Sequence, residues 1–231
     1  AQADFKRLIA YSSVAHLGFC MLGIFSLRPA GLVGAVLVMV NHGLSTGALF
    51  LVAGMIYDRY HTRRFDQLGG LARRMPAVAF FMMLFALSSL GLPGLNGFVG
   101  EFLVLLGSTG AGGGQTPQLP SLGLPFAAFA AFGVVLSAVY LLYLVGRLLF
   151  GPLTEPAEFH WRHSQLPPDA TGREWAILAP LAVLIVLVGV WPAPLVRSIQ
   201  RSTDLLLGQV CRAVQNYSPT GGAASTAPET P

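Results

Sequence analysis

Charge is scarce in this chain of 231 residues. Only 10% of the residues are charged, whereas 54% are apolar, and the mean hydropathy is +0.64. A soluble domain carries roughly 25% charged residues, so the composition excludes that class and indicates a polytopic membrane protein. Lysine occurs once, as Lys6, and the net charge of +4 comes from arginines gathered in loops, which argues against a nucleic-acid surface.

Residues for redox, metal and nucleophilic chemistry are equally sparse. The two cysteines, Cys20 and Cys211, lack the spacing of a disulfide framework or a metal site. The sequence also shows no glycine-rich nucleotide loop and no nucleophile triad. We therefore expect this chain to bind no cofactor of its own, and we expect its chemistry to be the ionisation of side chains inside a membrane.

Five apolar stretches are long enough to cross a bilayer, which takes about 17 to 25 helical residues. They cover residues 8–25, 32–57, 77–106, 124–150 and 175–191. The sequence therefore predicts an all-α transmembrane bundle over residues 1–192. Arginines cluster in the loop 58–76, whereas the loop 107–123 carries no charge. The positive-inside rule places the first loop in the cytoplasm, and alternation then places the second loop and the C-terminal tail outside.

The residues after the last span divide into two parts. Between residues 193 and 217, apolar side chains recur near helical spacing with arginines between them, which predicts a helix lying in the membrane interface. A weakly ordered tail is the alternative. Residues 218–231 are small, polar and rich in proline and glycine, which predicts disorder. The chain opens with Ala1 and shows no signal peptide, so we expect it to be part of something longer.

The third span is interrupted near its middle. Pro93 lacks a backbone N–H, and Gly91, Gly94 and Gly97 relax the backbone around it. This pattern predicts two half-helices in place of one helix, with Asn96 or Gly97 capping the second half. Broken helices are tolerated in a membrane only against protein or a wet cavity, so we expect this break to lie inside the bundle.

Glu101 follows the break and is the only acidic residue inside a long apolar stretch. A charged side chain at bilayer depth costs roughly 3 kcal/mol, so an intramembrane glutamate predicts a functional site. Half-helices that meet beside an ionisable group recur in ion-translocating membrane proteins. The alternative is a proline kink with a glutamate that reaches to the membrane surface.

The first span carries a polar face. At 100° per residue, Lys6, Ser13, His16 and Cys20 fall within an arc of about 80°. We expect this face to point into the bundle, where its groups could hold protons or water. For Lys6 an ordinary cytoplasmic anchor at the start of a helix is an equal alternative.

His42 lies near the centre of the second span. Ser45 and Thr46 follow one turn later, and Gly43 and Gly47 are expected to permit close helix approach. In hydrocarbon a neutral imidazole needs partners on both nitrogens, and it can relay protons near neutral pH. A purely structural histidine is the alternative. These residues together favour proton or cation transfer over bond-making chemistry.

Three stretches match a known family in the right order and at the right separations. QADFKRLIAYSSVAHLGF, HGLSTGALFLVAGMIYDRYHTRRFDQLGGLARRMP and GLPGLNGFVGEF resemble the C-terminal half of subunit M (chain 4) of respiratory complex I, the proton-pumping NADH:quinone oxidoreductase. The resemblance is close over residues 1–102 and is limited to hydropathy beyond them. It implies an antiporter-like subunit with two inverted repeats, each containing a discontinuous helix, and a central axis of Lys, His and Glu.

The resemblance also implies roles for individual residues. Lys6 matches the central lysine of the family, His42 matches the axis histidine, and Glu101 matches the acidic residue after the second break. The related subunits L and N and the multisubunit sodium/proton antiporters usually carry a lysine where Glu101 stands, which favours subunit M. We therefore expect a proton pathway made of Lys6, His16, His42, Ser45, Thr46 and Glu101.

The N-terminal half of the family, with its own discontinuous helix, has no counterpart in this sequence. We expect the partners to be that half and the other membrane-arm subunits, in a bacterial plasma membrane. FMN, iron–sulfur clusters and quinone would then belong to partner subunits. Two other functions stay open, namely a subunit of a multisubunit cation/proton antiporter and a structural membrane scaffold.

Overall fold

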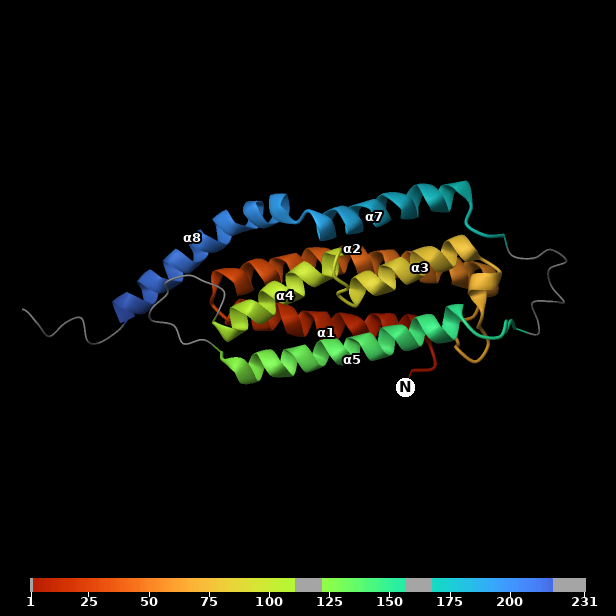
Figure 1. Cartoon of the computed structure of the whole chain (residues 1–231), viewed down its shortest axis with the longest axis horizontal. Coiled ribbons are helices and arrows are strands. Elements are labelled where there is room, and N and C mark those ends of the chain that lie inside the picture. The colour runs from red at the N-terminus through yellow and green to blue at the C-terminus, as the bar shows by residue number, and fades with distance from the viewer. Residues whose placement is uncertain (1, 111–121, 157–167, 218–231) are drawn as a thin grey trace, which may run out of the picture.

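The computed structural model describes residues 2–110, 122–156 and 168–217, which form helices joined by loops (Figure 1). Four of them are long and apolar enough to cross a membrane, namely α1 (Phe5–Phe25), α2 (Pro29–Tyr60), α5 (Leu124–Leu149) and α7 (Gly172–Val190). The others are η1 (Leu71–Arg73), α3 (Pro76–Ser89), α4 (Asn96–Thr109) and α8 (Ala193–Tyr217). Within the described ranges the only β-structure is two isolated bridges, so the predicted all-α class is confirmed.

Local sequence explains where the helices begin. Proline occupies the first turn of α2, α3 and α5, where its missing N–H and fixed φ suit a helix start. The side chain of Asp4 caps α1, and Thr171 forms a capping box with Glu174 at the start of α7. Helix α2 has 32 residues, which is about 48 Å of helix against a hydrocarbon core of about 30 Å. It is therefore long enough to cross a membrane and project beyond it.

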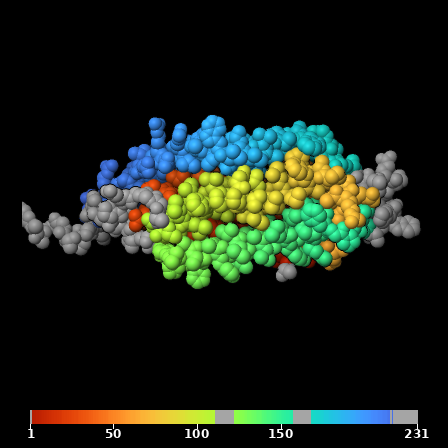
Figure 2. Space-filling model, viewed as in Figure 1, coloured from red at the N-terminus to blue at the C-terminus, as the bar shows by residue number. Residues whose placement is uncertain are grey.

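Helix α2 is the centre of the bundle. Helices α3 and α4 follow one another along it in place of one continuous span, with α1 and α5 on one side and α7 on the other (Figure 1). In the space-filling view α3, α4 and α5 cover the near face, and α7 and α8 form its upper edge (Figure 2). Glycines let α2 and α4 almost touch, because a β-carbon on Gly34 would lie 2.7 Å from the backbone nitrogen of Val104.

One end of the bundle is strongly basic. The start of α1, the 61–75 loop, the end of α5 and the start of α7 meet there (Figure 1). Ion pairs join these segments, including Arg59 with Glu174 and Arg74 with Glu155. The basic residues at this end are Lys6, Arg7, Arg59, Arg63, Arg64, Arg73, Arg74, Arg147 and Arg173. This grouping is what the positive-inside argument requires, and the assignment of this end to the cytoplasm stays a prediction.

The C-terminal helix α8 follows α7 after a short kink and extends along the outside of α2 (Figure 1). Thr203 and Leu207 are buried, whereas Leu205 is 72% exposed. The placement of this helix in the membrane interface stays a prediction. The predicted disorder of 218–231 and most of the loop 107–123 lie outside the described residues.

Candidate functional site

The predicted break in the third span is present between Ser89, the last residue of α3, and Asn96, the first of α4. Gly91 and Gly94 adopt φ angles of 78° and 95°, which residues with a side chain rarely adopt, and Pro93 lies between them. The chain therefore leaves the first half-helix, makes a tight turn and starts the second.

The capping prediction at this break is wrong. The N-cap of α4 is Leu95, which makes no side-chain hydrogen bond to the helix, while Asn96 is already helical. The carboxamide of Asn96 turns sideways and bonds to α2, because α2 offers Asn41 and Ser45 at the level of the break. The capping preference of asparagine is therefore overridden by a tertiary contact.

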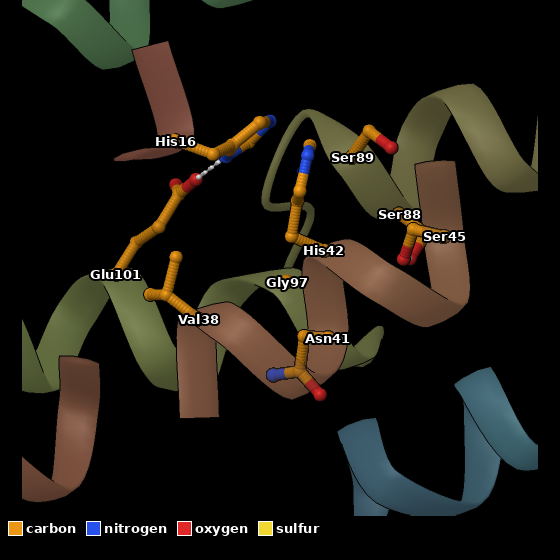
Figure 3. Close-up of a pocket in the computed structure, with 9 residues that line it drawn as sticks. All are labelled: His16, Val38, Asn41, His42, Ser45, Ser88, Ser89, Gly97 and Glu101. Atoms are coloured by element: carbon orange, nitrogen blue, oxygen red, sulfur yellow. Dashed lines mark hydrogen bonds and ion pairs between the residues drawn. The ribbon is translucent and has the colours of Figure 1, made fainter. Parts of the chain in front are cut away.

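Glu101 and His16 meet inside the bundle. The Nδ1 atom of His16 on α1 lies 3.2 Å from Oε1 of Glu101 on α4 (Figure 3). Both residues are buried, with 6% and 7% of their surfaces exposed. Gly91 makes room for the carboxylate, since a β-carbon there would lie 2.7 Å from Oε2. A single proton can occupy either side of this contact, as a neutral hydrogen bond or as an ion pair.

His42 on α2 continues the line from His16. The centroids of the two imidazole rings lie 4.8 Å apart with their planes at 39° (Figure 3). The Nε2 atom of His42 lies 3.0 Å from the hydroxyl of Ser13, and its Nδ1 atom lies 3.0 Å from the hydroxyl of Thr46. Both ring nitrogens thus have a partner that can donate or accept, so either tautomer is satisfied.

A small cavity of about 10 Å³ lies among these residues. That volume is about the space that one water molecule needs. Two buried polar atoms on residues that line it, Nε2 of His16 and Oγ of Ser89, have no hydrogen-bond partner among the described residues. Buried polar atoms are otherwise almost always paired, so this cavity is suited to a polar occupant.

Ser45 contacts the break in the third span. Its hydroxyl lies 2.8 Å from the hydroxyl of Ser88 and donates to Oδ1 of Asn96 over 3.1 Å. It also lines the cavity beside His42, and its place in the proton pathway stays a prediction. Thr46, in contrast, contacts His42 as expected from its place one turn later.

Lys6 is not part of this cluster. It lies exposed in the first turn of α1, ten residues before His16, which is about 15 Å of helix. The polar face of α1 turns inward from Ser13 to Cys20, whereas Lys6 is exposed in the described chain. In the same turn Phe5 is fully buried, so Lys6 lies on the side of α1 that faces away from the core. Its place in the proton pathway stays a prediction.

Ser13, on the predicted polar face of α1, contacts His42. Asn41, Ser88 and Ser89 also line the cavity, and these three escaped the sequence analysis. A signal existed in their position, because Asn41 directly precedes His42 and the serine pair directly precedes the break. Polar residues at such places in an apolar span should be counted among the candidate site residues.

Sequence comparison shows the family. The profile described as NADH:quinone oxidoreductase/Mrp antiporter, TM matches residues 1–117. Among curated relatives, NADH-quinone oxidoreductase subunit M of Rhodobacter capsulatus is 43% identical over 227 residues, which is 98% of this chain and 40% of the relative. The subunit M of Pseudomonas aeruginosa is 43% identical over 194 residues, covering 84% of this chain and 34% of the relative. The similarity therefore extends well beyond residue 102, where hydropathy alone was expected.

Comparison with solved structures agrees with this family assignment. A chain of respiratory complex I from Thermus thermophilus matches with a TM-score of 0.75 and 33% identity, covering 90% of this chain and 40% of that one. A chain of the Mrp complex from Dietzia sp. matches with a TM-score of 0.68 and 24% identity over 88% of this chain and 43% of that one, which shows the shared fold. This chain spans about two fifths of the length of such relatives. It is a multi-pass membrane protein that belongs to the NADH:quinone oxidoreductase/Mrp antiporter family.

Proposed function

We propose that this chain is the C-terminal part of a proton-translocating membrane subunit of NADH:quinone oxidoreductase. The observation that carries the proposal is the line of Glu101, His16 and His42 at the broken helix, in which Glu101 and His16 are buried and His42 is partly buried. Intramembrane ionisable residues in contact with one another mark proton relays. The chain then serves an enzyme complex without holding its redox centre.

Each contact in the line supports one step of proton movement. A proton can pass between the carboxylate of Glu101 and Nδ1 of His16 through their 3.2 Å contact. From His16 it needs a bridge, which a water in the small cavity would supply, since Nε2 is otherwise without a partner. At His42 the hydroxyls of Ser13 and Thr46 can each take over a proton.

Electrostatic repulsion makes the steps sequential. Two protonated imidazoles 4.8 Å apart repel by about 3 kcal/mol at an effective dielectric constant near 20. That disfavours the doubly charged state by about a hundredfold. A proton that arrives at His42 therefore drives a proton on His16 toward Glu101. A change of field from a neighbouring subunit would move protons along the line in the same way.

The remaining parts of the system lie outside this chain in the proposal. FMN, iron–sulfur clusters and quinone belong to partner subunits, and the N-terminal half completes the membrane subunit. Lys6, at the basic end of α1, would exchange protons with the cluster through that missing half. The basic end would face the cytoplasm of a bacterium and the C-terminal tail its exterior.

A multisubunit cation/proton antiporter is the second candidate. The structural likeness to an Mrp complex favours it, although at 24% identity that likeness speaks for the fold alone. Glu101 stands where the antiporters and subunits L and N usually carry a lysine, and this glutamate, together with 43% identity to subunit M proteins, supports the oxidoreductase. Flavin and iron–sulfur absorbance in the purified complex would decide between the two.

The test is Glu101→Gln in the intact complex in sealed vesicles. Glutamine keeps the size and a hydrogen bond but cannot titrate, so we expect normal assembly and a fall in proton translocation of at least about tenfold. Glu101→Asp should keep part of the activity. Asp66→Asn, an exposed acid at the basic end, is the control and should pump normally. Wild-type numbers of protons per electron with Glu101→Gln would disprove the function.

A further inference from the structure

Asn96 joins both half-helices to α2. It is the first residue of α4 and is fully buried, with 0% of its surface exposed. Its Oδ1 accepts hydrogen bonds from the hydroxyl of Ser45 on α2, at 3.1 Å, and from the hydroxyl of Ser88 on α3. One carboxamide thus contacts the end of the first half-helix, the start of the second and the helix behind them.

Asn41 completes the arrangement from the side of α2. Its Nδ2 donates to the backbone carbonyl of Asn96 over 2.6 Å, and Nδ2 of Asn96 donates to Oδ1 of Asn41 over 3.3 Å. The Ser45 and Ser88 hydroxyls lie 2.8 Å apart. We call these four residues, Asn41, Ser45, Ser88 and Asn96, the amide latch.

Packing and hydrogen bonds together hold α4 against α2. The two helices approach closely through glycines such as Gly34 and Gly100, and the side chain of Val38 on α2 packs against Gly100. No side chain caps the start of α4, because its N-cap is Leu95. Hydrogen bonds between buried partners have strict geometry, so they restrict movement of α4 along α2 more tightly than these apolar contacts do.

The latch asparagines lie close to His42 and Glu101 on the same two helices, α2 and α4. Asn41 directly precedes His42 on α2, and Asn96 precedes Glu101 by five residues, about 7.5 Å along α4. A shift of α4 would change the 3.2 Å contact between Glu101 and His16. Misplacement of reacting groups by about 1 Å can slow a reaction about a hundredfold.

We propose that Asn41 and Asn96 are positioning residues, which hold the two half-helices against α2 in the one register that aligns Glu101 with the histidines. This inference rests on the proposed function. Buried polar groups always need hydrogen-bond partners. The proposal goes further, because it states that these hydrogen bonds also set the distances over which protons are transferred.

The experiment uses Asn41→Leu, Asn96→Leu and the double variant in the intact complex in sealed vesicles. Because either substitution opens the same latch, we expect each to lower proton translocation about tenfold and the double variant to be no worse than the poorer single. The infrared carboxyl band of Glu101, assigned by its loss in Glu101→Gln, should shift in all three. Ser137→Ala, a buried serine of α5 outside the latch, should change neither quantity.

A second variant tests the proposal if a leucine variant does not assemble. If Asn96→Leu fails to assemble, Ser45→Ala combined with Ser88→Ala removes both hydroxyl donors with little change of volume. This variant should pump about threefold less and shift the same band. Additive losses in the leucine variants, or an unshifted Glu101 band, would overturn the proposal. Normal pumping by Glu101→Gln would instead reject the proposed function, so the two failures are distinguishable.

Discussion

Gly97 lies directly against the backbone carbonyl of Ser88, with no space between them for a β-carbon. This contact joins the first turn of α4 to the last turn of α3. We expect Gly97→Ala to push the half-helices apart at a cost of about 2 kcal/mol and to lower the amount of this chain in the purified complex. Gly54→Ala, on α2 where an added methyl meets nothing, should assemble normally. Equal yields of the two variants would contradict the expectation.

His16 should act together with Glu101. His16→Gln keeps a hydrogen-bonding group beside the carboxylate but cannot carry a proton, so it should reduce translocation about as much as Glu101→Gln. The double variant should lose no more than either single, because both changes interrupt the same transfer. Proton uptake by vesicles after a pulse of NADH measures this. Independent, multiplying losses would place the two residues in separate pathways.

His42 should matter less than Glu101. His42→Ala opens a space that water can fill, so we expect slower translocation with part of the rate retained. Thr46→Val, which removes the partner of Nδ1, should have a smaller effect in the same sense. Thr203→Val on α8 is the matched control. Loss of the chain from the complex in His42→Ala, with normal pumping in Thr46→Val, would favour a structural histidine.

Lys6 tests whether the basic end supplies protons. We expect Lys6→Ala to lower coupled translocation while leaving assembly intact, since its side chain is exposed in the described chain. Lys6→Arg keeps a charge but cannot release a proton near neutral pH, so it should behave like the alanine variant. Full activity in Lys6→Arg with loss in Lys6→Ala would identify an ordinary charged anchor.

Stability at the basic end should depend on Arg59. Its guanidinium pairs with both carboxylate oxygens of Glu174, at 2.8 and 2.7 Å, and donates to the carbonyls of Pro168 and Asp169. Arg59→Ala leaves the partly buried carboxylate of Glu174 with Thr171 as its remaining partner and should cost about 2 kcal/mol, seen as earlier thermal release of this chain from the complex. Arg64→Ala breaks the pair with Asp66, whose side chains are 60% and 58% exposed, and should have no measurable effect.

Features with a local physical cause were predictable from the sequence. The break follows from Pro93 and the glycines beside it, and the isolation of Glu101 in an apolar stretch singled it out before its burial and its contact with His16 were seen. The contacts of side chains whose partners lie far along the chain were not predictable. Asn96 reads locally as a cap, but Asn41 draws its side chain to α2.

The glycines of α2 show the same limit. Gly43 and Gly47 were expected to permit close helix approach, and a β-carbon at either would meet nothing within 4 Å. The close contact lies at Gly34, against α4. Which face of an all-apolar helix meets its neighbour is set by the whole bundle, because hydropathy is nearly uniform around such a helix.

The hydrogen-bond partners of His42 impose no direction on proton transfer. The hydroxyls of Ser13 and Thr46, each 3.0 Å from a ring nitrogen, can rotate to give or take a proton with equal ease. In the proposed pathway, a proton that enters from either side of the membrane therefore meets the same kind of partner, so we expect this segment to conduct protons in both directions. Any one-way movement has to be imposed from elsewhere in the complex, so a leak toward the driving side is what a detached or de-energised subunit should show.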